Sequence, residues 1–568
     1  MILSLCVVAW MLQPGQVKLP VHGQLIGIQP GEDWSLPLGT EAVVHSGFFS
    51  EDAYPSFQVP IRSIDVSWRQ LNPSPGVFAT NLTGSAQGMN FDSLDDQLAL
   101  SGPYWMRLWA SGVDWAPSWI ISECGITETW EDYDNQFHLP IWNTCVWNHL
   151  MACYRHMFQQ LNLRADPDLI LMYVPGAFTW CEFDYEIIDQ AASSGLEFAT
   201  FNTWFQGAMA EMVSIFNGEN SDPNDDFASK LVFTGEDFPW GPWDGQANLL
   251  ARDAVVHGTG IRSGITELFN FHLNHTPAYG ATIAQDGHIL TDEDWPLLMG
   301  DRIIAAENEC FNDCGYSTTD HWYAVKMANL KALQLRVNYL YVVPSDSYMG
   351  EFPEHWEWVR MSLGQKPQTA PDAWVAMREF QDIYWVDEDS HTWPERPWIH
   401  NFERWLVQRD LPPNGQTQRG TDVRVDVLEP DNGISYEGRR TNQAQGQDRI
   451  YFFVDDRFMA GENDQSQIKV TYLDSGTGTW HLEFMTAQGL SQSESILNTN
   501  SGLLKTATFE LENPLFSNGM DQGADFTIVV LGSDIEVRFV RLIRGPESLD
   551  YSSWPTPNSI LFFIGMLQ

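Results

Sequence analysis

The sequence predicts an α/β protein, in which a (β/α)8 TIM barrel is followed by a C-terminal antiparallel β-sandwich. From about residue 40 to 380, short apolar strands alternate with helical stretches, which is typical of parallel βα units. After residue 412 short strands follow one another without a convincing helix, which favours a sandwich. We therefore expect a barrel over 21–410 and a sandwich over 415–546. A possible signal segment (1–20) and a tail (547–568) flank them.

Eight candidate strands match the number of strands in a (β/α)8 barrel. They lie at 42–49, 61–68, 104–110, 169–174, 231–235, 261–269, 302–307 and 338–343. Helical stretches accompany them at 91–100, 146–161, 186–216, 246–257, 321–336 and 371–380. The last is predicted as the final barrel helix because Pro371 suits the first turn of a helix. No glycine-rich phosphate loop follows the first strand, so an open doubly wound sheet is the less favoured alternative.

The second region begins at a Pro-Pro-Asn-Gly run over 412–415, which is typical of a linker. Alternating apolar residues then predict strands at 422–428, 449–454, 468–473, 480–484, 505–511, 526–531 and 535–543. The Asp-Ser-Gly-Thr-Gly segment at 474–478 predicts a hairpin between two of them.

Composition excludes several classes of function. The 75 acidic and 30 basic residues give a formal charge of −45, which argues against nucleic acid or anionic lipid as a partner. An aromatic content of 13% excludes intrinsic disorder, and no apolar run is long enough for a membrane span. A carboxylate-rich chain with seven lysines fits saline surroundings, where salt screens self-repulsion, although an ordinary acidic secreted protein would look the same.

The first dozen residues and the cysteines bear on location. Residues 1–12 resemble the apolar part of a signal peptide without its basic start, so we expect a secreted, extracellular or periplasmic protein; a buried N-terminal segment is the alternative. Without Cys6, six cysteines remain, which permits disulfides. Cys310 with Cys314 is the first expected pair, and Cys124 with Cys145 the next. No CxxC pair accompanies them, so we expect neither a metal nor a cofactor.

Acidic residues at strand ends suggest the chemistry. In a (β/α)8 barrel the working residues lie at the carboxyl ends of the strands. Glu182 follows the fourth predicted strand, Glu236 and Asp237 follow the fifth, Glu267 lies on the sixth, and Glu307 and Glu309 end the seventh. Cleavage of a glycosidic bond needs two carboxyl groups, one to donate a proton and one to attack the anomeric carbon or to activate water. Glutamates from strands four and seven would face each other across the barrel mouth.

Two segments carry a resemblance to a known group of enzymes. Residues 68–78 (WRQLNPSPGVF) resemble the pattern W-x-x-[IL]-E-P-x-x-G-x-[YF], and 104–120 (YWMRLWASGVDWAPSWI) resembles a third strand ending in P-x-W. Both are found in clan A glycoside hydrolases, notably the family 42 type of β-galactosidase and related agarases. The resemblance spans about residues 40–345 as spaced fragments, and it implies a TIM barrel and a retaining mechanism.

The same resemblance assigns roles. It implies that Glu182 is the acid/base and that Glu307 or Glu309 is the nucleophile. The two latter residues share strand parity, and we favour Glu307 because it directly follows an apolar run. The sequence departs from the clan at two positions: Cys181 stands where an Asn usually precedes the acid/base, and Asn72 replaces the Glu of the strand-two pattern. The sugar 2-hydroxyl would then be bound by another residue.

Aromatic and polar residues near the strand ends supply the candidate substrate contacts. Sugar rings stack their C–H faces on aromatic rings, and their hydroxyls bind carboxylates and amides. The candidates are Trp68, Arg107, Trp109, Trp180, Glu236, Asp237, Trp240, Trp243 and His272. Core packing is the alternative for the tryptophans, and a structural histidine for His272. Arg107 and Arg69 would bind an anionic glycan or pair with nearby acids. Glu236-Asp237 is the main rival to the favoured glutamates; its alternatives are to pair with Arg262 or to bind a substrate hydroxyl.

The sequence thus predicts a secreted retaining glycoside hydrolase that cleaves β-linked glycans, and the resemblance suggests a marine galactan of the agar or carrageenan type. Its expected partner is an oligo- or polysaccharide. A serine hydrolase is disfavoured because no G-x-S-x-G elbow is present, and no histidine lies close in sequence to Cys181. Two alternatives stay open: a non-catalytic carbohydrate-binding or surface protein, and a polysaccharide lyase with a Tyr, His or Lys base.

Overall fold

The chain divides into two compact units in a computed structural model. The structure describes residues 19–37, 39–51, 59–175, 179–183, 185–235, 237, 242–263, 277–308, 320–381, 398–423, 435–463 and 465–545. The larger unit contains 34–405 and 419–439, and the smaller unit combines the residues before 34 with 406–418 and those from 440 onwards. Residues 21–33, which the sequence suggested would belong to the barrel, are therefore grouped with the C-terminal strands.

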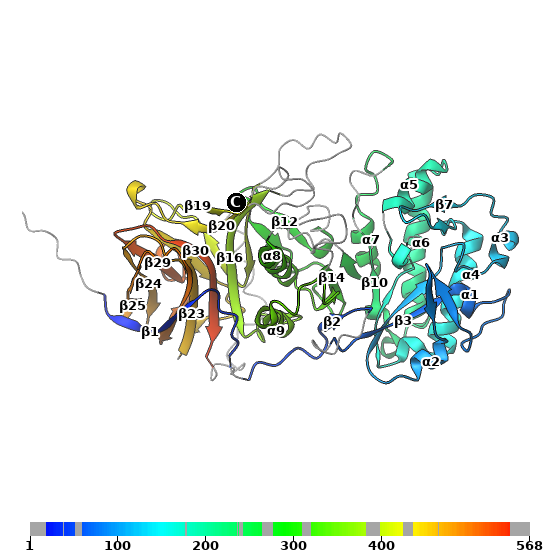
Figure 1. Ribbon diagram of the computed structural model, residues 1–568, viewed down its shortest axis with the longest axis horizontal. Coiled ribbons are helices and arrows are strands. Elements are labelled where there is room, and N and C mark those ends of the chain that lie inside the picture. Colours follow the sequence, from blue (N-terminus) through cyan, green and yellow to red (C-terminus); the bar gives the residue numbers. More distant parts are fainter. Residues whose placement is uncertain are drawn as a thin grey trace, which may run out of the picture. The chain divides into compact units, whose positions relative to one another are not determined.

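The larger unit contains an eight-stranded parallel sheet (Figure 1). Its order is β2 (Gly47–Phe49), β15 (Tyr339–Val342), β14 (Ile304–Asn308), β11 (Gly260–Ser263), β10 (Leu231–Phe233), β9 (Leu169–Tyr173), β6 (Tyr104–Trp109) and β3 (Arg62–Ser67). A parallel bridge between Phe49 and Ile61 joins the first strand of this order to the last. The sheet therefore fits a (β/α)8 barrel, and each of the eight predicted strand positions contains one of its strands.

Helices connect the parallel strands, as the alternating pattern predicted. They are α1 (Trp68–Leu71), α2 (Leu94–Leu98), α3 (Trp119–Glu123), α4 (Thr144–Arg155), α5 (Tyr185–Ser193), α6 (Phe198–Phe216), α7 (Leu250–His257), α8 (His321–Gln334) and α9 (Pro353–Ser362). The predicted helix 186–216 is divided into α5 and α6, and a one-turn π-helix (His156–Gln160) extends α4. Helix α9 has Pro353 in its first turn, which is the position that the missing N–H of proline tolerates.

The predicted helix at 371–380 is wrong. Residues Asp372–Gln381 form strand β16, which pairs antiparallel with β17 (Trp398–Arg404) and β20 (Ser435–Arg440). Residues 372–380 are all buried, on both faces of the strand. A short apolar run of this kind has no period that separates a strand from a buried helix, so sheet pairing decides its conformation. Strand β19 (Gln418–Asp422) pairs with β20.

Outside the barrel sheet, the described residues of the larger unit form three two-stranded hairpins. They are β4 (Gly84–Ala86) with β5 (Met89–Phe91), β7 (Trp130–Glu131) with β8 (Phe137–His138), and β12 (Ala281–Ile283) with β13 (Ile289–Thr291). The β7–β8 hairpin lies in the connection between β6 and α4, and therefore follows the carboxyl end of the third barrel strand. This is the face on which barrel enzymes build their sites.

Aromatic side chains fill the barrel interior. One buried cluster includes Phe49, Trp105, Leu171, Tyr173 and Tyr341, which come from four different strands. Trp105 packs 4.9 Å from Tyr173 between ring centroids, and Phe49 packs 5.4 Å from Tyr341. Burial of such large apolar surfaces is the main stabilising contribution to a barrel core.

The smaller unit is built on mostly antiparallel strands. Its path is β30 (Glu536–Arg544), β23 (Gln465–Leu473), β27 (Leu504–Glu512), β1 (Val21–Pro30), β25 (Gly489–Ser493), β24 (Thr479–Thr486), β29 (Phe526–Leu531), β21 (Arg449–Val454) and β18 (Leu406–Arg409). Short strands β22 (Gly461–Glu462), β26 (Ile496–Leu497) and β28 (Leu515–Phe516) complete it. The predicted strands 449–454 and 526–531 coincide with β21 and β29, whereas 422–428 falls largely outside the described residues.

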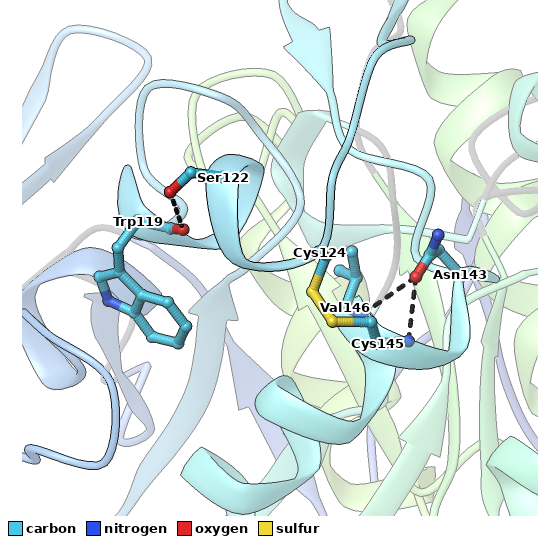
Figure 2. The surroundings of a disulfide bond; sticks show 6 residues. All are labelled: Trp119, Ser122, Cys124, Asn143, Cys145 and Val146. Atoms are coloured by element: carbon cyan, nitrogen blue, oxygen red, sulfur yellow. Dashed lines mark hydrogen bonds between the residues drawn. A yellow bond between two sulfur atoms is a disulfide. The ribbon is translucent and has the colours of Figure 1, made fainter.

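The described residues contain one disulfide, between Cys124 and Cys145, with an S–S distance of 2.01 Å (Figure 2). It was the second of the two expected pairs; Cys310 and Cys314 lie outside the described residues. Cys153 and Cys181 are free and buried. Within the described ranges, none of the helices is long and apolar enough to cross a membrane.

Candidate functional site

Glu182 and Glu307, the two favoured candidates from the sequence, are joined by one arginine. Arg262 on the sixth barrel strand, β11, donates through Nη1 to Glu182 Oε1 at 2.6 Å and through Nη2 to Glu307 Oε1. Glu307 lies on β14, the seventh strand, and Glu182 follows β9, the fourth. Three strands that are separated in sequence thus bring two carboxylates to one guanidinium.

An unusual backbone conformation precedes Glu182. Trp180 and Cys181 have φ angles of +69° and +65°, which non-glycine residues rarely adopt. Two such residues in succession cost about 1–3 kcal/mol each and persist only where the surroundings enforce them. Here the Cys181 thiol donates to the carbonyl of Leu108 at 3.4 Å, and the N–H of Phe183 donates to the Thr234 hydroxyl at 3.2 Å. The turn that presents Glu182 is therefore fixed on both sides.

The Arg262 guanidinium lies between two tyrosine rings. Its Cζ is 5.6 Å from the ring centroid of Tyr173 and 5.5 Å from that of Tyr341. Tyr341 is the register partner of Glu307 on the neighbouring strand β15. Aromatic faces stabilise a cation by their quadrupole, and they keep water away from it. We call Arg262, Glu182 and Glu307, with Tyr173 and Tyr341, the Arg262 cluster.

A second arginine makes a similar arrangement on the other side of the barrel. Arg107 on β6 donates to Asp65 Oδ1 at 2.6 Å and to Glu51 Oε1 at 2.5 Å. Burial works against its charge, but Asp65 and Glu51 outweigh burial and hold the pKa of Arg107 well above its ordinary value. Asp65 also accepts a hydrogen bond from Trp109 Nε1 at 2.8 Å. We call Arg107, Asp65 and Glu51, with Trp105 and Trp109, the Arg107 cluster.

The Arg107 side chain, a predicted glycan ligand, is thus paired with two carboxylates of its own barrel. Its Cζ lies 4.9, 5.1 and 5.7 Å from the rings of Trp105, Trp109 and Trp180. Arg69, the other arginine considered, donates to the carbonyls of Ala116 and Val113 at 2.9 and 2.8 Å. Arg107 therefore pairs with nearby acids, which was one of its two expected roles, whereas the contacts of Arg69 are with backbone carbonyls and not with acids.

The predicted tryptophan contacts differ in exposure. Trp68 and Trp109 are fully buried and pack in the core. Trp243 donates its indole N–H to the Leu196 carbonyl at 2.9 Å and packs on Phe201, with 5.2 Å between ring centroids. Trp180 is only partly buried, packs 5.7 Å from Trp109, and lies two residues before Glu182. Among these four, Trp180 therefore combines partial exposure with a position two residues before Glu182.

Asp237, predicted as a substrate ligand, is 1% exposed and bound to helix α7. Its Oδ1 accepts the backbone N–H groups of Ala251 and Arg252 at 3.0 and 3.3 Å, and its Oδ2 accepts Arg252 Nε at 2.8 Å. Burial nevertheless raises the pKa of this carboxyl to about 7. These contacts anchor the first turn of α7. Five further candidates, Glu236, Trp240, Glu267, His272 and Glu309, lie outside the described residues.

Two other reactive groups near the site are held in their protonated forms. Burial raises the pKa of the Cys181 thiol well above its ordinary value, which disfavours the thiolate that a nucleophile needs. Burial likewise raises the pKa of the Tyr173 phenol. The Tyr173 hydroxyl is buried and makes no hydrogen bond to the described residues, so it is a donor suited to a ligand and poorly suited to act as a base.

The sequence reasoning missed the central role of Arg262. It was considered only as a partner of Glu236 and Asp237, because sequence separation does not show which strands meet inside a closed barrel. A signal was present: an arginine within the strand Gly260–Ser263 must be paired when it is buried. The Asp65–Arg107 pair was also detectable in principle, since these residues are register partners on adjacent strands.

Groups that could hold a metal are scarce in the described part of the chain. One cluster of three metal-ligating side chains is found there, formed by Cys124, Cys145 and His149. Both of its sulfur atoms form the disulfide, so neither is a thiolate ligand.

Comparison with known proteins gives little further information. No protein-family model and no curated protein matches the sequence. Among solved structures, a β-porphyranase of glycoside hydrolase family 86 from the human gut bacterium Bacteroides plebeius matches 88% of this chain and 98% of its own chain, with 8% identity and a TM-score of 0.26. A structure described as BiXyn10A CBM1 APO matches 25% of this chain and 97% of its own, with 9% identity and a TM-score of 0.13. These similarities are too weak to indicate a function.

Proposed function

We propose that this protein is a retaining glycoside hydrolase of β-linked glycans, with Glu182 as acid/base and Glu307 as nucleophile. The observation that carries the proposal is the Arg262 cluster, in which glutamates from the fourth and seventh barrel strands share one guanidinium. These are the strands from which clan A enzymes, which the sequence resembles, take their two carboxylates. Both glutamates belong to the face of a parallel barrel on which active sites are built.

The Arg262 cluster is compatible with a retaining geometry. The two terminal nitrogens of one guanidinium bind Glu182 and Glu307, so their carboxylates lie close together. Retaining enzymes hold their carboxyl groups about 5–5.5 Å apart, whereas inverting enzymes need about 6.5–9.5 Å to admit a water molecule. We choose the retaining mechanism because the resemblance to clan A enzymes implies it.

The proposed reaction is a double displacement. Glu307 attacks the anomeric carbon while Glu182 protonates the leaving glycosidic oxygen, which forms a glycosyl-enzyme intermediate. Glu182 then removes a proton from water, which hydrolyses the intermediate. In the free protein Arg262 favours the ionised form of both glutamates, so the glycan must take the place of the guanidinium beside Glu182 before that residue can hold a proton.

The chemistry of the site favours hydrolysis over the lyase alternative. A lyase needs a base close to neutral pKa, and the tyrosine in the cluster, Tyr173, has its pKa raised by burial. Partly exposed Trp180 offers a ring on which a sugar stacks, and the Tyr173 hydroxyl is a candidate donor in place of the absent Asn before Glu182. We further propose a galactan of the agar or carrageenan type as substrate, and secretion, with which the Cys124–Cys145 disulfide is consistent.

Substitution of each glutamate tests the proposal. The full chain is incubated with agarose, porphyran and κ-carrageenan, and the release of reducing ends is measured. We expect Glu182→Gln and Glu307→Gln each to lower the rate by at least about 10³-fold, which corresponds to about 4 kcal/mol of transition-state stabilisation. Glu211→Gln is the matched control, because Glu211 also pairs with an arginine, Arg155, but on helices α6 and α4. It should leave the rate unchanged.

Azide separates the two roles. A small-residue variant of a retaining nucleophile can be rescued by azide, which attacks in its place. We expect Glu307→Ala with azide to give a glycosyl azide of inverted anomeric configuration, identified by NMR. Full activity of both Gln variants on a glycan that the wild-type protein cleaves would contradict the site assignment. Inverted stereochemistry of the wild-type product would contradict the retaining mechanism.

A further inference from the structure

Two aromatic side chains in the connection that follows the third barrel strand are exposed to solvent. Tyr133 and Phe137 on the β7–β8 hairpin are 61% and 51% exposed, although most aromatic residues of this unit are buried. In β8, Phe137 alternates with His138, which is fully buried, so the two faces of the hairpin differ sharply. One face belongs to the core, and the other presents the exposed ring.

A buried polar relay holds this hairpin in place. The Ser111 hydroxyl hydrogen-bonds His138 Nδ1 at 2.8 Å, and His138 Nε2 hydrogen-bonds Asp132 Oδ2 at 2.7 Å. The other oxygen of Asp132 accepts the backbone N–H groups of Asp134 and Gln136 at 2.9 and 2.8 Å, which closes the hairpin turn. Such a network is specific when it is fully satisfied, so it fixes the turn on which the exposed rings lie.

The relay is too deeply buried to be a serine-hydrolase triad. Ser111 is 2% exposed and His138 is completely buried, so an ester has no access to the hydroxyl. The backbone supports the same structural role: Val113 N–H donates to the Phe137 carbonyl, and Leu139 N–H donates to the Ser111 carbonyl, both at 2.7 Å. The relay therefore positions the hairpin on the end of β6.

Three further contacts hold the same connection in place. The Cys124–Cys145 disulfide closes a 21-residue separation around the hairpin (Figure 2). Next to it, Asn143 Oδ1 accepts the N–H groups of Cys145 and Val146 at 2.9 and 3.3 Å and so begins helix α4. At the hairpin turn, the N–H of Tyr133 donates to Glu186 on α5, four residues after Glu182. The connection is thus tied to the segment that presents the proposed acid/base.

A continuous row of rings connects the hairpin with the proposed catalytic site. Trp130 of β7 stacks on His138 at 4.6 Å, and His138 lies 5.7 Å from Trp115. Trp115 packs 5.6 Å from Trp109, which packs 5.7 Å from Trp180, beside Glu182. Each step is a close aromatic contact, so the buried face of the hairpin packs against a row of rings that ends at Trp180, two residues before Glu182.

We propose that Tyr133 and Phe137 form a distal sugar-binding subsite, which makes the protein specific for polymeric glycans that it cleaves internally. This inference rests on the proposed function. A pyranose presents an apolar C–H face that fits an exposed aromatic ring, and a ring that is already fixed loses little conformational entropy on binding. The occupant is a sugar unit of the same glycan chain that spans Glu182 and Glu307, because the hairpin follows the carboxyl end of β6, the end of the barrel at which both glutamates lie.

The test separates polymer binding from catalysis. The catalytically impaired variant Glu307→Gln is run in native gels that contain agarose, porphyran or κ-carrageenan, and its retardation is compared with that of a variant that also carries Tyr133→Ala and Phe137→Ala. We expect retardation in at least one gel, with an apparent affinity about tenfold weaker when the two rings are removed. Leu100→Ala is the matched control: Leu100 is 60% exposed, like Tyr133, but lies before β6, at the opposite end of that strand.

Kinetics give a second readout. With the catalytic glutamates intact, Tyr133→Ala/Phe137→Ala should raise the KM for the polymer about tenfold and leave kcat/KM for the shortest cleaved oligosaccharide unchanged. Equal retardation of the variants with and without the rings, or none in any gel, would overturn the subsite. Ring-dependent retardation of a wild-type protein that hydrolyses none of the three glycans would keep the subsite and overturn the proposed hydrolysis. A fall of more than about 1 kcal/mol in the free energy of unfolding of the double variant, measured by chemical denaturation, would show that the rings serve folding instead.

Discussion

The Arg107 and Arg262 clusters contain the same kinds of side chain, but the fold brings these side chains together in different ways. In both, a buried barrel arginine is paired with two carboxylates and packed against aromatic rings. Arg107 and Asp65 are register partners on adjacent strands, so sheet formation by itself brings them together. Glu182 and Glu307 come from strands that are not neighbours, and Glu182 lies beyond its strand, after two residues with positive φ. The first cluster follows from local pairing, and the second requires the completed barrel and a costly turn.

This difference indicates which cluster is available for chemistry. Asp65 is already bound by Trp109 and Arg107, and three tryptophan rings surround that arginine. The Arg262 cluster has two tyrosine rings instead, and Tyr173 has a hydroxyl without a partner in the described residues. A conformation that costs free energy and is retained is a reason to suspect function, whereas an ion pair between register partners on adjacent strands is not.

The largest expected effect is on stability at the Arg107 cluster. Arg107→Met leaves Asp65 and Glu51 without their cation, and we expect the free energy of unfolding to fall by about 3–5 kcal/mol. Chemical denaturation measures the change. Addition of Asp65→Asn and Glu51→Gln to Arg107→Met should recover much of it, because no unpaired buried charge is then left. A loss below about 1 kcal/mol would show that this cluster is not a fixed part of the frame.

The next effect concerns the pH dependence of the proposed reaction. Arg262→Met removes the cation that is paired with Glu182 and Glu307, so the ionised form of at least one carboxyl should become less favourable. Since the nucleophile must be ionised, the acid limb of kcat/KM should move to higher pH. Arg107→Met, in protein that remains folded, should not move it. An acid limb that does not respond to Arg262→Met would place the titrating group elsewhere.

A smaller effect, on the pH dependence of stability, is expected from the buried histidine His355. His355 on α9 packs against Trp34, Trp322 and Trp358 at 4.3, 5.0 and 5.8 Å, and neither ring nitrogen has a hydrogen-bond partner in the described residues. Burial, aided by the charge of Lys326, lowers its pKa well below the ordinary value. The unfolded state therefore binds a proton that the folded state does not, and stability is lost as the pH falls through the unfolded pKa of about 6.5.

The size of this loss can be measured by substitution. Between pH 6.5 and 5 we expect His355 to reduce the free energy of unfolding by about 2 kcal/mol. His355→Phe fits the same aromatic surroundings and removes the titrating group. The difference in unfolding free energy between pH 7 and pH 5 should therefore be smaller in His355→Phe than in the wild-type protein. Identical differences in the two proteins would mean that His355 is protonated in the folded state.

The fold was predictable where a pattern repeats within a few residues. Short apolar runs located β21 and β29 at their observed bounds, and the barrel strands were found because such runs recur between helical stretches. Strand β16 was mistaken for a helix because burial on both faces leaves no period, and Pro371 suggested the first turn of a helix. Strand β1 was missed because most of its residues are exposed and its partners lie more than 450 residues away in the sequence.

The candidate site was predictable only in part, for a related reason. Glu182 and Glu307 could be proposed from their places at the ends of strands four and seven. Arg262 could not be assigned to them, since that requires knowing that strand six points its side chain at both. Trp68, Trp109 and Trp243 were expected near the sugar, but packing places the first two in the core and seats Trp243 on α6. Composition gives the number of tryptophans and no information on which of them meet solvent.

The position of β1 constrains how the molecule is made. This strand pairs with β25 on one side and β27 on the other, so that Gly23 lies opposite both Ser493 and Leu511. During synthesis from the N-terminus, residues 21–30 leave the ribosome long before their neighbours exist, and the whole larger unit is translated in between. The barrel can begin to fold during this time, whereas the smaller unit must wait for nearly the last residue of the described chain. A ribosome that stalls after residue 405 would release a chain with a barrel and an unmatched strand, which is the kind of edge that invites aggregation.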